Sequence, residues 1–124
     1  MICQPKSQTR IFVVDGCPND YANVVDASVF NSVRFKFFGT GCDALRVNPD
    51  EEPEMWVVNM QLSDMPGTDL FGLLRSRGSS VPILLVGDQY RVEDEVNART
   101  SGAAMYFAKP LQSEWLLSSA TQVA

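Results

Sequence analysis

The sequence contains no histidine among its 124 residues. This absence excludes histidine-based acid–base catalysis, histidine metal ligation and a histidine phospho-carrier role. Only three cysteines are present, Cys3, Cys17 and Cys42, and their spacing matches no metal site. We therefore expect reduced thiols and a cytoplasmic location.

Long apolar runs and clusters of basic residues are also missing. No run is long enough to span a membrane, and the first residues lack the apolar core of a signal peptide. The ten basic residues are scattered and the formal net charge is −5. Because nucleic-acid phosphates are bound by clustered Lys and Arg, we expect no direct nucleic-acid partner and no membrane partner.

Short apolar runs alternate with helical patterns along the chain. Strands are predicted at 10–15, 33–38, 55–59, 82–86 and 104–108. Helices are predicted from Pro18, over 42–47, from Gly67 to about Gly78, over 90–101 and from Leu111 onward. Such alternation predicts an α/β fold with a parallel sheet. Residues 1–9 are expected to form a disordered leader, and 10–124 a single domain.

Three of these helices have predicted inward faces. The first is carried by Tyr21, Val24, Val25, Ser28 and Val29, at helical spacing. The helix after Gly67 is expected to turn Leu70, Leu73 and Leu74 inward, and the last helix carries Leu116, Leu117 and Ala120.

The predicted strands end in polar residues or glycines. Asp15 and Gly16 follow the first strand, Asn59 ends the third, Gly87 and Asp88 follow the fourth, and Lys109 follows the fifth. Ligands of open α/β sheets bind beyond the carboxyl ends of the strands, so these residues are the candidate site.

Four segments resemble the receiver domain of two-component response regulators. They are Ile11-Phe12-Val13-Val14-Asp15, Met55-Trp56-Val57-Val58-Asn59, Val81 to Gly87, and Tyr106-Phe107-Ala108-Lys109-Pro110. The resemblance extends from about Arg10 to Ala120. It implies a flavodoxin-like (βα)5 fold, doubly wound, with a five-stranded parallel sheet in the order 2-1-3-4-5.

The resemblance also implies residue roles, and this chain departs from several of them. In the family, two adjacent acids bind Mg²⁺ with the phospho-acceptor aspartate. Asp15 matches the first acid, Gly16 replaces the second and Asn59 replaces the acceptor. Gly87 replaces a hydroxyl residue that contacts the phosphoryl group. Lys109 matches the lysine that precedes a proline in the family and pairs with the phosphoryl group. Tyr106 matches an aromatic residue that changes rotamer on activation.

These departures predict a degenerate phospho-acceptor pocket, or pseudo-receiver. Asp15 and Lys109 alone would be formally neutral, so Mg²⁺ binding is expected to be weak or absent, with Asp15 a vestigial ligand. An amide is a poor nucleophile, so phosphorylation of Asn59 and enzymatic activity are not expected. We instead expect an Asp15–Lys109 ion pair joined by Asn59. Asp88 is expected to be a solvated loop aspartate; the alternative is that it turns toward the pocket and restores a second carboxylate.

The resemblance places the interaction surface on the fourth helix, fifth strand and fifth helix. Its candidate residues are Tyr90, Arg91, Glu95, Arg99 and Trp115, with Tyr106 at the switch position. Because Gly87 has no side chain to move, we expect Tyr106 to keep one rotamer. The expected partners are a histidine kinase, an effector domain or another signalling protein, and a homodimer through the same elements is a further expectation.

Three alternatives stay open. The domain is a functional phospho-receiver if Ser63, Asp64 or another residue accepts the phosphoryl group. It is a flavodoxin-like ligand-binding domain if the loop after the first strand binds a flavin phosphate, although that loop, Asp15 to Asp20, is acidic. Cys17 as a hydrolase nucleophile is disfavoured, because no histidine activates it and Asp15 lies beside it.

Overall fold

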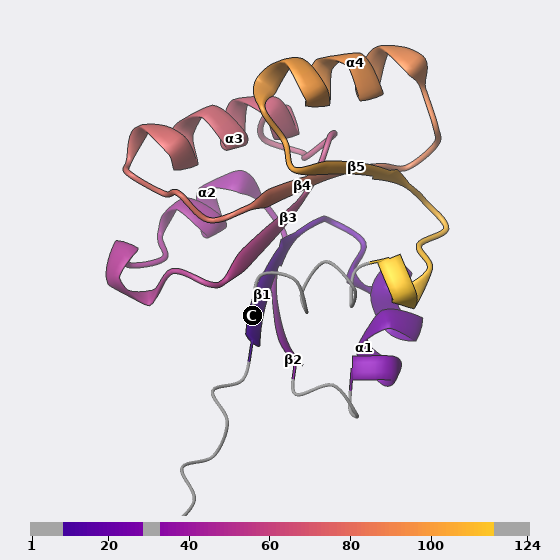
Figure 1. Cartoon of the computed structure of the whole chain (residues 1–124). Coiled ribbons are helices and arrows are strands. Elements are labelled where there is room, and N and C mark those ends of the chain that lie inside the picture. Colours follow the sequence, from indigo (N-terminus) through magenta and orange to yellow (C-terminus); the bar gives the residue numbers. More distant parts are fainter. Residues whose placement is uncertain (1–8, 29–32, 116–124) are drawn as a thin grey trace, which may run out of the picture.

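The computed structural model describes residues 9–28 and 33–115, and its centre is a five-stranded parallel sheet (Figure 1). The strands are β1 (Thr9–Val14), β2 (Val33–Phe38), β3 (Met55–Asn59), β4 (Ile83–Gly87) and β5 (Met105–Ala108). Their order is β2-β1-β3-β4-β5, and every neighbouring pair is parallel. The flavodoxin-like α/β fold predicted from the sequence is therefore confirmed.

Helices lie on both sides of this sheet. The 3-10 helix η1 (Pro18–Tyr21) continues into α1 (Ala22–Ser28) on one side, whereas α2 (Gly41–Leu45), α3 (Gly67–Ser76) and α4 (Val92–Ser101) lie on the other (Figure 1). A second 3-10 helix, η2 (Pro49–Glu51), precedes β3. Pro18 and Pro49 stand at the first position of η1 and η2, where a missing N–H costs no helical hydrogen bond.

The period-two alternation of the strands produces a core on each side of the sheet. Ile11 and Val13 pack toward the α1 side, whereas Phe12 and Val14 pack toward the α2–α4 side. Every residue of β3 and of β4 is buried. Burial on both faces explains why these strands are continuous apolar runs instead of alternating ones.

The structure corrects some details of the predicted elements. Leu73 does not face inward: its side chain is 45% exposed, and Phe71 of α3 is buried instead, at 5%. Leu70 and Leu74 are buried as expected. An α-helix rotates about 100° per residue, so Leu70, Phe71 and Leu74 share the face of α3 that is turned toward the sheet. Leu73 lies at the edge of this face and is directed toward solvent.

Two predicted segments fall largely outside the described residues. β1 begins at Thr9, inside the segment expected to be a leader, and residues 1–8 are not described. Residues 113–115 are helical, but Leu116, Leu117 and Ala120 of the last predicted helix lie outside the described part, as does Val29. Among the described helices, each is too short or too polar to cross a bilayer.

Candidate functional site at the carboxyl edge of the sheet

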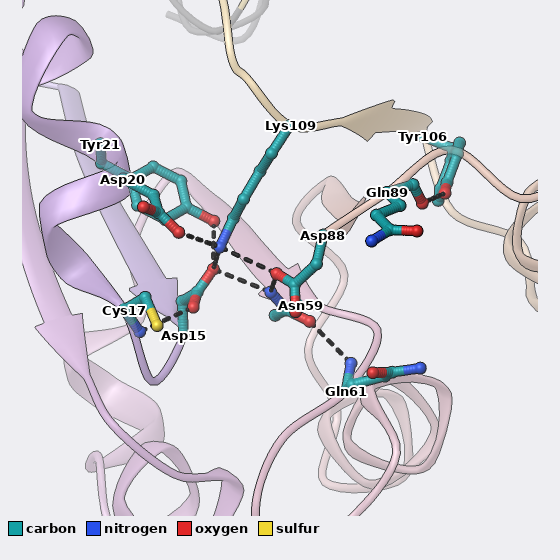
Figure 2. A network of polar contacts seen from close by, with 10 residues as sticks. All are labelled: Asp15, Cys17, Asp20, Tyr21, Asn59, Gln61, Asp88, Gln89, Tyr106 and Lys109. Atoms are coloured by element: carbon teal, nitrogen blue, oxygen red, sulfur yellow. Dashed lines mark hydrogen bonds and ion pairs between the residues drawn. The ribbon is translucent and has the colours of Figure 1, made fainter.

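Side chains from four strands meet at one edge of the sheet (Figure 2). Asn59 is the last residue of β3, and Asp88 directly follows β4. Asp15 and Lys109 come just after β1 and β5, and both extend the sheet ladder by one hydrogen bond: Asp15 N donates to Phe38 O at 2.9 Å, and Lys109 N donates to Gly87 O at 2.9 Å. These backbone bonds fix where the two charged side chains begin.

The ammonium of Lys109 lies between three carboxylates. Its Nζ is 2.9 Å from Asp15 Oδ2, 2.7 Å from Asp20 Oδ2 and 3.0 Å from Asp88 Oδ1. An ammonium has three N–H donors, so each has one carboxylate as its acceptor. The Lys109 side chain is only 9% exposed, and its Nζ also lies 5.6 Å from the centre of the Tyr21 ring. We call Asp15, Asp20, Asn59, Asp88 and Lys109 the Lys109 cluster.

The Asn59 amide joins two of these carboxylates. Its Nδ2 donates to Asp15 Oδ2 at 3.0 Å and to Asp88 Oδ1 at 2.9 Å, and its Oδ1 accepts from Gln61 N at 2.7 Å. Asn59 is 2% exposed. Both amide protons therefore have anionic acceptors inside a buried site, where hydrogen bonds to charged groups are strongest. An aspartate at this position would place an anionic oxygen where the Nδ2 nitrogen of Asn59 now donates to Asp15 and Asp88.

Asp15 is held on both of its oxygens. Oδ1 accepts from the backbone N–H of Cys17 at 2.9 Å, and Oδ2 accepts from the Tyr21 hydroxyl at 2.8 Å in addition to Asn59 and Lys109. Its exposure is 3%. Burial, followed by the charge of Asp15, raises the pKa of Tyr21, so this phenol remains protonated and continues to donate.

The charges of the cluster also shift the pKa of two other members. Burial by itself would lower the pKa of Lys109, but hydrogen bonds to Asp20, Asp15 and Asp88 outweigh it and raise that pKa above its usual range. The hydrogen bond from Asn59, and then the contact with Lys109, lowers the pKa of Asp88. Lys109 is thus charged, and Asp88 ionised, over the whole neutral range.

A tight loop after β3 packs closely against the backbone of Asn59. The loop turns back so that Gly67 N donates to Met60 O at 2.8 Å, and Gln61 pairs with Pro66 as an isolated antiparallel bridge. A Cβ on Gly67 would overlap the carbonyl oxygen of Asn59. The spacing from Asn59 to Gly67 therefore has a steric cause: only a residue without a side chain permits this close approach.

The charge balance predicted from the sequence is wrong. Counting Asp15 and Lys109 alone gave a neutral site, but Asp20 and Asp88 also lie within ion-pair distance of Lys109, so three carboxylates surround one ammonium. Asp20 was not included in the prediction, because only residues at the ends of strands were considered. Asp20 lies in η1, which turns it back toward the edge of the sheet. The sequence feature that indicates this contact is the short spacing of Asp15 and Asp20 across one proline-containing turn, which brings both carboxylates to the same edge.

The expected ion pair between Asp15 and Lys109, with Asn59 attached, is present. The Asp88 carboxylate also turns inward and contacts Lys109 and Asn59, which is the alternative that the sequence disfavoured. Gly16 contributes no carboxylate to the site. It is exposed, and no atom lies within 4 Å of where its Cβ would be. The loop from Asp15 to Asp20 directs two carboxylates at Lys109, an arrangement opposite to that of a phosphate-binding loop.

The donor set does not fit the Mg²⁺ site that the family resemblance implies. Of the three carboxylates in that site, only the one matched by Asp15 remains, and both its oxygens already accept hydrogen bonds. The described residues contain no cluster of three or more Asp, Glu, His or Cys side chains arranged to hold a metal ion. The point where carboxylates converge is filled by the ammonium of Lys109, which supplies the positive charge.

Next to the cluster, a cavity of about 160 Å³ opens between the end of β4 and the start of α4. It is lined by Met60, Gln61, Gly87, Asp88, Gln89, Arg91 and Asp94. Tyr106 borders this region: its hydroxyl lies 3.5 Å from the carbonyl oxygen of Gln89 (Figure 2). Tyr106 is half-buried and packs against the core cluster on the α2–α4 side.

The candidate interface residues separate into two groups. Tyr90 donates to Glu95 at 2.7 Å and Arg99 donates to Glu95 at 3.1 Å, whereas Arg91 stands at the N-cap position of α4 without a side-chain capping hydrogen bond. Trp115 instead stacks on Phe107 at 5.2 Å, and Phe107 packs toward the α1 side of the sheet. Trp115 and the α4 residues thus associate with opposite faces of β5.

Known proteins share this architecture. A family model described as the response regulator receiver domain matches residues 11–121. The probable transcriptional regulatory protein TcrX of Mycobacterium tuberculosis is 33% identical over 76 residues, which are 61% of this chain and 32% of TcrX. Response regulator MprA of Mycobacterium ulcerans is 28% identical over 108 residues, which are 87% of this chain and 47% of MprA. The chain thus spans about a third to a half of these relatives.

A solved structure gives the same answer for the fold. A CheY-like response regulator receiver domain protein from Methanospirillum hungatei superposes with a TM-score of 0.80 over 94% of this chain and 93% of that chain, at 22% identity. The family model covers the strands that build the edge site, together with almost everything between and after them. The chain therefore belongs to the response regulator receiver domain family.

Proposed function

We propose that this chain is a receiver domain that signals by protein contact and takes no phosphoryl group, because an asparagine stands at position 59. Receiver domains are signalling modules and not enzymes in the usual sense, and response regulators interact with histidine kinases and effector domains. One observation carries the proposal: the Asn59 amide donates to both Asp15 and Asp88.

The chemistry of the amide supports the first half of the proposal. A phosphoryl acceptor must supply an anionic oxygen as nucleophile, whereas the Asn59 oxygen is neutral and already accepts from Gln61 N. Approach of a phosphoryl group would also bring negative charge to a cluster that already holds three carboxylates. The ammonium of Lys109 is engaged by these carboxylates, which leaves it less available to pair with phosphate.

Incubation with acetyl phosphate and Mg²⁺, followed by intact-mass spectrometry, tests this half. We expect no adduct with the mass of a phosphoryl group, while a receiver domain with an aspartate at the matching position acquires one in parallel. Stoichiometric phosphorylation of any aspartate would contradict the proposal.

A second candidate, phosphorylation at Asp88, has one observation in its favour. The Asp88 side chain is 57% exposed, and its Oδ1 lies beside both the Lys109 ammonium and the Asn59 amide, two donors suited to a phosphoryl group. Borohydride reduction of the treated protein converts an aspartyl phosphate to homoserine, and peptide mapping locates it. An adduct that disappears in Asp88→Asn would assign the acceptor to Asp88.

The second half of the proposal concerns the contact surface. We define the α4–β5 surface as the exposed or half-buried side chains Tyr90, Val92, Glu95, Val96, Arg99 and Met105. Four of them are large or apolar and strongly exposed, from 49% at Met105 to 59% at Val92. A cavity of about 150 Å³ lies between α4 and β5 beside Met105. Exposed aromatic and apolar side chains of this kind are common at protein interfaces.

A homodimer through this surface is one specific form of the contact. It predicts a sedimentation mass that rises with protein concentration and returns to the monomer in Val96→Asp. Loss of a kinase or effector interaction in the same variant, with the mass unchanged, would assign the surface to a different protein. An interaction with either partner that Val96→Asp and Met105→Asp leave unaffected would contradict the use of this surface.

A further inference from the structure

Gly87 is the feature that leads beyond the proposed function. It ends β4, is buried, and pairs with Ala108 of β5. A Cβ built on Gly87 would overlap the hydroxyl oxygen of Tyr106, and would lie 3.3 Å from Tyr106 Cζ and 3.0 Å from the carbonyl oxygen of Gln89. The tyrosine hydroxyl therefore occupies the place that any side chain at position 87 would need.

Tyr106 reaches this place from the neighbouring strand. It is half-buried, its ring packs against the core cluster on the α2–α4 side, and its hydroxyl lies 3.5 Å from Gln89 O. Burial raises the pKa of Tyr106. Rotation of the ring toward solvent would remove apolar surface from the core and leave a void beside Gly87, and both effects oppose the rotation.

The tyrosine is also connected to the exposed side of α4. The rings of Tyr106 and Tyr90 lie 6.3 Å apart, the Tyr90 hydroxyl donates to Glu95, and Arg99 donates to the other oxygen of Glu95. A continuous series of contacts thus runs from the end of β4, beside the Lys109 cluster, to the α4–β5 surface.

We propose that Gly87 holds Tyr106 permanently in its inward position, so that the α4–β5 surface keeps one arrangement whatever happens at the Lys109 cluster. The device is steric and needs no ligand: the missing Cβ makes room, and the tyrosine hydroxyl fills it. This inference goes beyond the proposed function, because the relation between Gly87 and Tyr106 is the same whether or not the domain is phosphorylated.

The position of the ring can be measured by NMR on protein with ¹³C-labelled tyrosine rings. The chain has three tyrosines, Tyr21, Tyr90 and Tyr106, and Tyr106→Phe assigns the relevant signal. We expect the wild-type protein to give one Tyr106 signal with a nuclear Overhauser contact to Gly87 Hα. In Gly87→Ala this contact should be lost, and the Tyr106 and Tyr90 signals should shift while that of Tyr21, buried on the other side, does not.

The matched control is Gly16→Ala. It adds the same methyl group at the same edge of the sheet, where no atom lies within 4 Å, so the tyrosine signals should not move. Two Tyr106 signals in the wild type, or an unchanged Tyr106 signal in a folded Gly87→Ala, would overturn the proposal.

A second variant keeps the test decisive if Gly87→Ala does not fold. Gly87→Ala combined with Tyr106→Phe removes the overlapping hydroxyl, so the double variant should recover a folded spectrum. A double variant as unfolded as Gly87→Ala would place the clash elsewhere and overturn the proposal. Repeating the wild-type spectrum with acetyl phosphate and Mg²⁺ distinguishes this inference from the proposed function. In that experiment a mass adduct contradicts the proposed function, and a displaced Tyr106 signal contradicts the fixed position of Tyr106.

Discussion

The Lys109 cluster and the α4–β5 surface both contain acidic and basic side chains, but they differ in what remains available to a partner. In the cluster, each donor of Lys109 and of the Asn59 amide has an acceptor within 3.0 Å, and Lys109, Asp15 and Asn59 are nearly buried. On α4, the Arg99–Glu95 pair is exposed, and Val92 and Val96 are more than half exposed.

This difference indicates which of the two regions can gain free energy by binding a partner. A ligand at the cluster must first break hydrogen bonds between charged groups, and Asp15 and Asn59 would be left buried without these partners. A partner at the α4–β5 surface displaces water from the exposed apolar side chains of Val92, Val96 and Met105, which is favourable, and the Arg99–Glu95 pair beside them is already exposed to solvent. The four predictions below test this contrast, from the largest expected effect to the smallest.

Removing the central ammonium should have the largest effect. Lys109→Met leaves Asp15 buried at 3% exposure without its counter-charge, so we expect the free energy of unfolding to fall by about 3 kcal/mol. Urea denaturation measures it. Lys36→Met removes an exposed lysine from β2 and serves as the control. Equal, small losses in the two variants would show that the cluster contributes no more than a surface charge.

Replacing the amide by a carboxylate should have the next largest effect. Asn59→Asp exchanges two hydrogen bonds for repulsion with Asp15 and Asp88, and we expect a loss of about 2 kcal/mol at neutral pH. Because the new carboxylate adds an oxygen ligand, Mg²⁺ should raise the melting temperature of the variant but not of the wild type.

Asn97→Asp makes the same exchange at an exposed position of α4, and it should change neither stability nor the response to Mg²⁺. Stabilisation of the wild type by Mg²⁺, to the same degree as Asn59→Asp, would mean that the ammonium does not close the cluster to divalent ions.

Acid should remove a smaller part of the stability of the cluster. Asn59 and Lys109 hold the pKa of Asp88 below its value in the unfolded chain, which is about 3.9. The ionised carboxylate therefore stabilises the fold above that pH, and the contribution is lost as pH falls through the lower folded-state pKa. The difference in urea midpoint between wild type and Asp88→Asn should shrink below about pH 4. A difference that stays constant down to acid unfolding would count against the ionised contact.

The smallest effect belongs to the α4–β5 surface. Val96→Ser should change the free energy of unfolding by less than about 0.5 kcal/mol, because the side chain is 54% exposed. Ala98 lies two residues away on α4 but is fully buried, so Ala98→Val should cost about 1–3 kcal/mol by overpacking. Similar losses in the two variants would show that Val96 packs in the domain and is not free to bind a partner.

The comparison also shows how far the sequence could be interpreted. The bounds of β3 follow from the apolar run Met55 to Val58 and the polar Asn59 that ends it, because a strand buried on both faces favours apolar residues along most of its length. The direction of Leu73 could not be read in the same way, because α3 offers several leucines and the sheet decides which of them it covers. The Asp15–Lys109 pair was predictable, since each residue directly follows a strand and the strand ends of a parallel sheet meet at one edge.

The sequence by itself determined the strand pattern, the amide at position 59 and the missing side chain at position 87, because these are matters of composition and order. Only the tertiary structure decided that Asp20 and Asp88 join Asp15 around Lys109, and that the Tyr106 hydroxyl fills the space beside Gly87. Such contacts join residues up to 89 positions apart, and they depend on the turn of a helix and the pleat of a strand, which no local pattern encodes.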